Sequence, residues 1–362
     1  MDLTGRRFLV IGGAGFIGSH VVDELLRRSV AEVLVYDSFT RGSRENLVNA
    51  VKDDRVSILE GKPKVSNLDR LKRAMTGVDG VFNLVAIGIL ACDQSPEKAI
   101  KINIEGNWNV FSTALSCGVK KIVHSSSASV YGDAVQEKMD EEHPYNNQTL
   151  YGATKIANEH ILRACAAKSD LKWAALRYFN VYGPRQDYKG AYISVLHRIL
   201  DRLNEGKPPV LFGDGSQTLD FVHVSDVARA NVLAMEADSP NGYFNVCSGE
   251  GTTLKEVAHL LMQLTGSADL QPEYRIANTG TSLVSRRIGN PHKAQEHLRF
   301  AATVHLADGL RSLIEWRNRN DARLRRLQTH DMPLPAITSR PVVRQRATAT
   351  VRFRRFAREA EG

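Results

Sequence analysis

The 362-residue chain is poor in cysteine and has no long apolar run. Its four cysteines, Cys92, Cys117, Cys165 and Cys247, are far apart in the sequence, so their spacing indicates neither a zinc site nor a redox pair. No apolar stretch approaches the length of a membrane span, and residues 1–7 lead into an expected strand without a signal-peptide pattern. These absences favour a cytoplasmic protein with no metal site and no membrane contact.

The body of the chain also lacks an excess of either charge. The net charge is +8, but residues 318–362 hold eleven arginines and four acidic residues, so this tail accounts for +7 of the total. A basic tail on a near-neutral body differs from nucleic-acid-binding folds, in which basic residues line a docking face. We therefore expect no nucleic-acid partner. Because the tail lacks lysine and shows no sustained periodicity, we expect it to be disordered.

What the chain does contain is an alternation of strands and helices. Short β-branched and apolar runs predict strands over 8–11, 32–36, 78–86, 121–125 and 173–177. Helical spacing of apolar residues predicts helices over 17–28, 69–75, 99–117 and 150–167. Repeated βα units predict an α/β fold of the Rossmann type, with a doubly wound parallel sheet.

The pattern changes after residue 180, where glycines and prolines divide the chain into shorter pieces. We interpret residues 1–179 as a nucleotide-binding domain, joined by a helix and a strand within 222–248. Residues 180–317 then form mainly a smaller C-terminal substrate-binding lobe, and 318–362 form the tail.

The first strand is followed by a glycine-rich turn that opens the first helix. Gly12, Gly15 and Gly18 permit a tight turn and let backbone N–H groups approach a pyrophosphate at the positive end of the helix. Phe16 and Ile17 belong to the same turn. A plain glycine-rich turn is the alternative interpretation, but the position between the first strand and the first helix favours a bound dinucleotide.

Asp37 ends the second predicted strand. A carboxylate there can accept hydrogen bonds from the adenosine ribose and would repel a 2′-phosphate, so the residue favours NAD over NADP. A strand-end cap is the other interpretation of Asp37, and nearby Arg41 keeps NADP as an alternative.

Tyr151 and Lys155 lie four residues apart in a predicted helix and therefore share one face. A free tyrosine has a pKa of about 10, and a neighbouring ammonium lowers that pKa by stabilising the phenolate. An isolated pair of this kind could equally be a packed aromatic ring and a solvated lysine. However, three serines, 125 to 127, follow a predicted strand at the edge where ligands bind. They could also form a helix-capping turn, but the ordered combination of all three motifs is specific.

With these motifs, the chain resembles the extended short-chain dehydrogenase/reductase family, in the branch of NAD-dependent nucleotide-sugar epimerases that are UDP-glucose 4-epimerase-like. The resemblance extends from about residue 8 to residue 316. It also includes the segments at 103–107, 176–184, 212–215 and 220–224.

The resemblance implies the catalytic roles. Tyr151 would be the general base that takes the proton of the sugar C4 hydroxyl, and Ser127 would bind the C4 oxygen. Lys155 would hold the nicotinamide ribose. Hydride would pass to NAD⁺ and return to the opposite face of the 4-keto sugar after the sugar turns.

The resemblance also implies binding residues and an assembly. Cofactor contacts are expected from the glycine turn, Asp37, Ala86, Asn103, Ser125, Tyr151 and Lys155, and substrate contacts from Ser127, Tyr151, Asn180 and Phe212. The helices predicted over 99–117 and 150–167 would pair with their copies in a homodimer. A reductase, a dehydratase or decarboxylase, and a cofactor-binding protein without activity remain alternatives.

Three positions depart from the family pattern. Leu219 stands where many relatives carry a phosphate-binding arginine, and Arg286 and Arg287 are either substitutes for it or a solvated pair. Lys62 follows Gly61 where an adenine-contacting aspartate is common. Dehydratases and decarboxylases usually carry an acid just before Val-Tyr-Gly, whereas this chain has Ala128 and Ser129 there.

Overall fold

The computed structural model describes residues 1–59, 64–190, 193–238, 241–276 and 284–329. Met1–Arg319 form one compact unit, and Asn320–Gly362 form a second. The fold described below is that of the first unit. Among the described residues, no helix combines the length and the apolar character that crossing a membrane requires.

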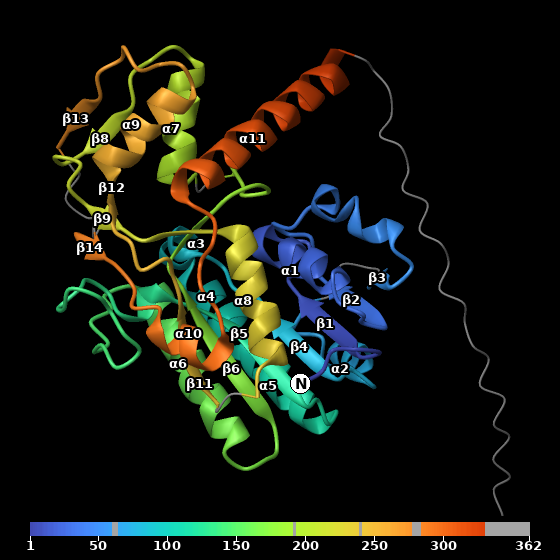
Figure 1. The fold of residues 1–362 in the computed structure, drawn as a ribbon. Helices are drawn as coiled ribbons and strands as arrows, with labels where there is room; N and C mark the ends of the chain where they lie inside the picture. The colour runs from blue at the N-terminus through green and yellow to red at the C-terminus, as the bar shows by residue number, and fades with distance from the viewer. Residues whose placement is uncertain (60–63, 191–192, 239–240, 277–283, 330–362) are drawn as a thin grey trace, which may run out of the picture. The chain divides into compact units, whose positions relative to one another are not determined.

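A seven-stranded parallel sheet forms the centre of the first unit (Figure 1), with the strand order β11-β6-β5-β4-β1-β2-β3. The strands are β1 (Arg7–Ile11), β2 (Glu32–Tyr36), β3 (Val56–Ile58), β4 (Gly80–Asn83), β5 (Lys121–Ser127), β6 (Lys172–Tyr178) and β11 (Gly242–Val246). The strand order reverses between β1 and β4, and such a switch point opens a ligand crevice at the carboxyl ends of the strands. The predicted Rossmann-type α/β fold is confirmed.

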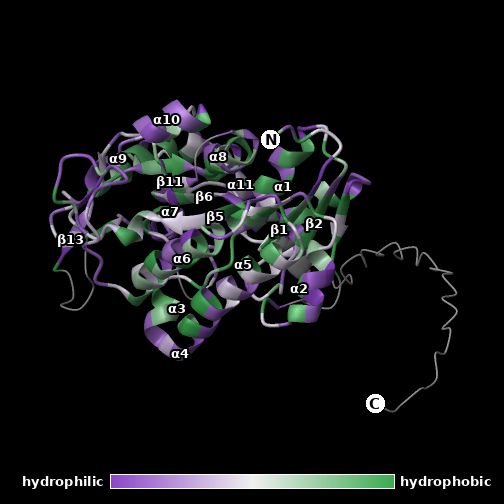
Figure 2. Ribbon diagram, turned by 90° about the horizontal axis from the view of Figure 1, so that it is seen from below, coloured by the Kyte–Doolittle hydropathy of each residue, from purple (hydrophilic) through white to green (hydrophobic). Residues whose placement is uncertain are grey.

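Both faces of the sheet are covered because successive side chains of a buried strand point to opposite sides. Phe8 and Val10 belong to one apolar cluster, whereas Leu9 and Ile11 belong to the other. Helices α1 (Phe16–Leu26), α8 (Val224–Glu236) and α10 (His292–Leu298) contribute to the first cluster. Helices α2 (Leu68–Met75), α5 (Gly106–Ser116) and α6 (Leu150–Ala166) contribute to the second. In Figure 2 the strands lie between these two sets of helices.

The segment predicted as one helix over 99–117 is three helical pieces. After α3 (Ile89–Gln94), helix α4 (Pro96–Ala99) leads into a π-helical turn, η3 (Ile100–Glu105), and then into α5. Such π-turns are frequent at functional sites. Here the turn contains Asn103, one of the predicted cofactor residues, and that side chain is fully buried.

A smaller lobe is built mainly from the chain after residue 180. Its strands are β7 (Asn180–Tyr182), β8 (Val210–Phe212), β9 (Thr218–Leu219), β10 (Phe221–His223), β12 (Thr252–Thr253), β13 (Glu273–Arg275) and β14 (Arg286–Arg287). Helices α7 (Val195–Asn204), α9 (Leu254–Leu264) and the first turns of α11 (Leu306–Thr329) share a third apolar cluster with β8. Short 3₁₀ helices complete the chain: η1 (Arg44–Leu47), η2 (Ala50–Lys52) and η4 (Ala128–Val130).

Two sequence-based boundaries are wrong. The strand predicted over 78–86 is β4, which is shorter at both ends and spans only Gly80–Asn83. The irregular tail was expected from residue 318, yet α11 continues to Thr329. This stretch contains no proline or glycine and is rich in arginine and leucine, which are good helix formers. The rest of the predicted tail, residues 330–362, lies outside the described residues.

Candidate active site

The glycine turn that follows β1 has no room for side chains. Gly12 has a φ of +80°, a conformation that favours glycine. A Cβ atom on Gly18 would lie 2.1 Å from the carbonyl oxygen of Gly12, so only glycine fits. Gly15 caps α1 without a side-chain hydrogen bond, and the backbone N–H groups of the first turn, at Phe16 and Ile17, have no partner within the helix. The turn therefore suits a pyrophosphate at the helix N-terminus.

Asp37, at the end of β2, is linked to this turn. Its carboxylate accepts hydrogen bonds from the backbone N–H groups of Ala14, at 2.9 Å, and Phe39, at 2.7 Å. Burial raises the pKa of Asp37, although both hydrogen bonds oppose that rise. Each oxygen keeps a lone pair for a further donor such as a ribose hydroxyl. The strand-end cap and the ribose contact are thus compatible interpretations of the same residue.

A buried amide network shapes the loop after β4. Asn103 accepts a hydrogen bond from the Ile87 N–H at 2.8 Å and donates to the Ile87 carbonyl at 3.1 Å and to Thr154 Oγ1 at 3.2 Å. Asn83 donates to Asn107 Oδ1 at 2.7 Å. The network fixes the segment that contains Ala86, which is half-buried, against α6. Sequence reasoning identified Asn103 but missed the other two asparagines, because their roles depend on side chains meeting across elements.

Lys155 and Tyr151 lie on the face of α6 that meets β5. The Lys155 ammonium is 2% exposed and donates a hydrogen bond of 2.6 Å to the Ser125 carbonyl. Its nitrogen lies 5.7 Å from the centroid of the half-buried Tyr151 ring. Burial lowers the pKa of Lys155 to about 8, while Glu159 opposes that fall. A cation held this close to a tyrosine ring can stabilise a phenolate.

The serine segment begins within β5 and turns at its end. Ser125 Oγ and the Tyr178 hydroxyl are 2.9 Å apart, and burial raises the pKa of Tyr178 to about 12. Ser127 Oγ accepts a hydrogen bond from the Ser129 N–H and donates one to Ser129 Oγ, both at 3.1 Å. The serine segment is therefore both a capping turn and a polar group at the sheet edge. Ser127 caps η4, and the residue remains partly exposed at the end of β5.

The sequence analysis did not identify the buried ion pair behind Lys155. Arg177 donates to both carboxylate oxygens of Glu159, at 2.9 and 2.7 Å, and both side chains are fully buried. Burial by itself would lower the pKa of Arg177, but the hydrogen bonds with Glu159 outweigh this effect and raise it. The available sequence signal was Glu159 itself, an acid four residues after Lys155 on the same helix face.

The predicted substrate residues lie in the smaller lobe. Asn180, on β7, donates a hydrogen bond of 3.0 Å from its side chain to the Asp220 carbonyl. The Asp220 carboxylate accepts from the backbone N–H groups of Ser248, at 2.8 Å, and Gly249, at 2.9 Å, and thereby joins β10 to the end of β11. Phe212 ends β8 and is 38% exposed, so its ring is available to a ligand.

Leu219 and Arg287 are neighbours. Strand β14 runs parallel to β9, with Arg287 in register with Leu219. Arg287 donates to the Gly132 carbonyl at 3.2 Å, whereas Arg286 approaches the exposed Glu137 at 3.7 Å. The two arginines are thus not equivalent. Arg287 lies beside Leu219, the residue that departs from the family pattern, whereas Arg286 faces outward. The departure at Lys62 lies outside the described residues.

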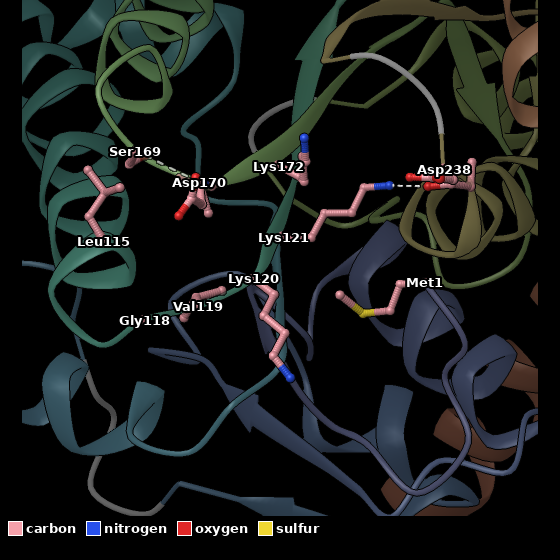
Figure 3. Close-up of a pocket in the computed structure, with 12 residues that line it drawn as sticks. Met1, Leu115, Gly118, Val119, Lys120, Lys121, Ser169, Asp170, Lys172 and Asp238 are labelled. Carbon is pink, nitrogen blue, oxygen red and sulfur yellow. Dashed lines mark hydrogen bonds between the residues drawn. The ribbon is translucent and has the colours of Figure 1, made fainter.

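A pocket of about 520 Å³ lies at the opposite edge of the sheet, where β5 and β6 begin (Figure 3). Lys120, Lys121, Lys172, Asp170 and Asp238 contribute to its lining. Lys121 donates a hydrogen bond of 2.6 Å to the carbonyl of Ala237, the residue that ends α8. A lysine at this place satisfies a helix C-terminus and its negative dipole. We therefore interpret this pocket as structural, and the ligand crevice remains at the carboxyl ends of the strands.

Comparisons with known proteins agree with this geometry. The family described as "NAD dependent epimerase/dehydratase family" matches residues 8–247. The UDP-glucose 4-epimerase structure from Thermotoga maritima, with UDP-glucose, is 34% identical, with a TM-score of 0.79 over 87% of this chain and 99% of that one. The UDP-glucose 4-epimerase of Mycolicibacterium smegmatis is 32% identical over 86% of this chain and 98% of its own length.

Other relatives catalyse a different reaction. A UDP-N-acetyl-alpha-D-glucosaminuronate decarboxylase from Bacillus cytotoxicus is 30% identical over 86% of this chain and 97% of its own length. The individual site residues stay predictions, as does their division between cofactor and substrate. The family match and these relatives nevertheless establish the class: the chain is an NAD-dependent, nucleotide-sugar-modifying enzyme and belongs to the NAD-dependent epimerase/dehydratase family.

Proposed function

We propose that the protein epimerises a nucleotide sugar at C4, with a UDP-hexose as the substrate. The observation that carries the proposal is the Lys155 ammonium, which is buried beside the Tyr151 ring at the carboxyl end of β5. Only strand β4 lies between β5 and β1, the strand that the glycine turn follows. The named 4-epimerases among the relatives, one of them with UDP-glucose, support the choice of reaction and of nucleotide.

In the proposed mechanism, Tyr151 accepts the proton of the C4 hydroxyl. The charge of Lys155 makes this possible at neutral pH because it stabilises the phenolate. Ser127 redirects its single hydroxyl proton from Ser129 Oγ to the C4 oxygen and keeps that oxygen beside Tyr151. Bound NAD supplies the hydride acceptor and donor. After the keto sugar turns, Tyr151 returns the proton to the C4 oxygen, so the residue is restored in each turnover.

A dehydratase or a decarboxylase is the nearest alternative. Both reactions need an additional acid or base for elimination, and Ala128 and Ser129 occupy the positions where the family resemblance expects it. In the structure, Ser129 is engaged with Ser127, and Ala128 is buried. This arrangement favours a reaction that needs one proton acceptor, as epimerisation does.

The substrate diphosphate would be held by Arg287. It lies next to Leu219, at the place where many relatives have their phosphate-binding arginine, and its backbone is fixed by the β9–β14 pairing. A guanidinium on the neighbouring strand can replace the missing arginine. A charge-assisted hydrogen bond requires only that the guanidinium reaches the phosphate oxygens, whichever strand carries the arginine. Phe212 and Asn180 would complete the nucleotide and sugar contacts.

The test is incubation of the purified enzyme with UDP-, GDP- and dTDP-hexoses, with product stereochemistry assigned by NMR. We expect interconversion of C4 epimers for a UDP-hexose and no net release of NADH. Accumulation of a reduced, dehydrated or decarboxylated product instead would contradict the proposal. Tyr151→Phe serves as the matched control because it keeps the ring and removes the ionisable oxygen.

We also propose a homodimer and the domain division given above. Trp108 on α5 is 50% exposed and Ile100 is 46% exposed, and Ile161 on α6 is partly exposed. These residues give the two predicted pairing helices apolar groups that a second copy would bury. Light scattering that detects a monomer at micromolar concentration would exclude the dimer.

A further inference from the structure

Two consecutive residues of β5 hold two oppositely charged side chains of α6. The Ser125 carbonyl accepts the Lys155 hydrogen bond at 2.6 Å, and the Ser126 hydroxyl donates to Glu159 at 2.5 Å. Lys155 and Glu159 lie one helical turn apart and face the same side. Both are buried, at 2% and 0% exposure. The catalytic lysine and the Glu159 carboxylate are therefore parts of one structural unit.

The Lys155 ammonium needs such a carboxylate. Burial disfavours a charged amine, and a backbone carbonyl offers only partial compensation. Burial lowers the pKa of Lys155 to about 8, and Glu159 is the group that opposes this fall most strongly. Without a negative charge nearby, the amine would lose its proton at a still lower pH, and a neutral amine cannot stabilise a phenolate.

Glu159 itself is held in position by its other partners. Arg177 binds both carboxylate oxygens, and the Tyr145 hydroxyl lies 3.3 Å from Glu159 Oε2. Arg177 is fixed in turn by hydrogen bonds to the Tyr131 hydroxyl, at 2.9 Å, and the Glu141 carbonyl, at 3.0 Å. A bidentate arginine with this support fixes the position of the Glu159 carboxylate with geometric specificity.

Burial shifts the pKa values of three other titratable groups around Lys155. On β5, burial and then Lys155 lower the pKa of His124 well below its ordinary value. On α3, burial raises the pKa of Cys92. On β6, burial raises the pKa of Tyr178, the partner of Ser125, to about 12. Tyr151 is the group that Lys155 acts on. Among the described residues that act on Lys155, Glu159 is thus the group that most strongly opposes the fall of the Lys155 pKa.

We propose that Glu159 is a positioning residue for catalysis: its buried carboxylate, held by Arg177 and Ser126 one helical turn from Lys155, favours the ammonium form of the lysine that the Ser125 carbonyl holds beside Tyr151. The inference rests on the roles of Tyr151 and Lys155 in the proposed function. Glu159 touches neither cofactor nor substrate in this proposal and acts only through Lys155.

The test is the ionisation of Tyr151 in Glu159→Gln, which keeps the shape of the side chain and removes its charge. The ultraviolet difference absorbance of the phenolate is measured against pH for each enzyme with and without the Tyr151→Phe change. We expect the Tyr151 midpoint to rise by about one pH unit in Glu159→Gln, the size typical of a lost charge interaction. A folded Glu159→Gln enzyme with the wild-type midpoint would overturn the inference.

Two further variants separate charge from structure. Glu159→Gln combined with Arg177→Met leaves no unpaired guanidinium and should show the same upward shift. Tyr145→Phe removes a hydroxyl from the ion pair but keeps the carboxylate, so it should lower the melting temperature and leave the midpoint unchanged. An equal shift in Tyr145→Phe would mean that only packing matters and would contradict the inference. If Glu159→Gln alone fails to fold, the double variant carries the test.

The titration needs no sugar, so it separates this inference from the proposed function. If no hexose nucleotide is epimerised but the midpoint shifts as expected, the inference stands and the proposed reaction fails. If the enzyme epimerises a UDP-hexose and the midpoint does not move, the reaction stands and the role of Glu159 is wrong.

Discussion

Two buried lysines lie at opposite edges of the same sheet. Lys155, at the carboxyl end of β5, donates to the Ser125 carbonyl, and Lys121, at the start of β5, donates to the Ala237 carbonyl, each at 2.6 Å. Burial lowers the pKa of each to about 8. By hydrogen bonding and by pKa alone, the two lysines cannot be distinguished.

Their surroundings differ. Lys155 lies beside the Tyr151 ring, with the buried Glu159 carboxylate one helical turn away. Lys121 lies at the end of α8, near the exposed Asp238 and the exposed Lys172. A perturbed pKa indicates a functional site only when a second group can use the charge. The comparison shows that the pKa of a buried lysine does not by itself reveal its role. The neighbouring groups decide whether the lysine can take part in catalysis or caps a helix.

The largest expected difference is in turnover. Tyr151→Phe and Lys155→Met should each lower the rate of hydride transfer by at least about 10²-fold, the lower end of general-base contributions. Lys121→Met should leave the rate close to that of the wild type. Single-turnover formation of NADH with the accepted sugar nucleotide measures all three. A strong loss in Lys121→Met, or normal turnover in Tyr151→Phe, would break the distinction between the two edges.

The second difference is in stability against pH. Burial lowers the pKa of each lysine to about 8 in the folded protein from an ordinary value of 10.5, so the unfolded chain binds more protons between these two pH values. Stability therefore rises with pH across this window, by up to about 1.4 kcal/mol per pH unit for each lysine. The cost of burying the charge is present in full below pH 8.

Lys155→Met should remove that rise and stabilise the protein at pH 7 by about 1 to 3 kcal/mol, because it replaces a buried ammonium with an apolar chain. Lys121→Met should gain less, since Lys121 also satisfies the end of α8. Urea unfolding at pH 7 and at pH 10 gives both values. A large loss of stability in Lys155→Met would show that its hydrogen bond outweighs the cost of the buried charge.

The smallest expected effect is that of Asp238→Asn. The carboxylate is exposed, and interactions of exposed charges contribute little to stability. Neither the melting temperature nor the turnover should change measurably. A clear change in turnover would mean that the two edges of the sheet are coupled, and the structural interpretation of the Lys121 pocket would be wrong.

Much of the site could be predicted because its motifs are local. The turn with Gly12 and Gly18 is specified by neighbouring residues, and the spacing of Tyr151 and Lys155 sets their common face on any helix. The same holds for the element order, and hence for the parallel sheet. The end of β4 and the extent of α11 were missed, since boundaries depend on competition between local propensity and tertiary contacts.

The sequence by itself determined the alternation of strands and helices, the glycine turn and the tyrosine–lysine pair, because each depends on residues close together along the chain. Only the tertiary structure decided that Arg177 pairs with Glu159 behind Lys155, that Arg287 lies beside Leu219, and that Lys121 caps a helix. These contacts join residues from different elements, and their energies depend on burial and distance. Neither quantity exists until the sheet has formed and the helices have packed against it.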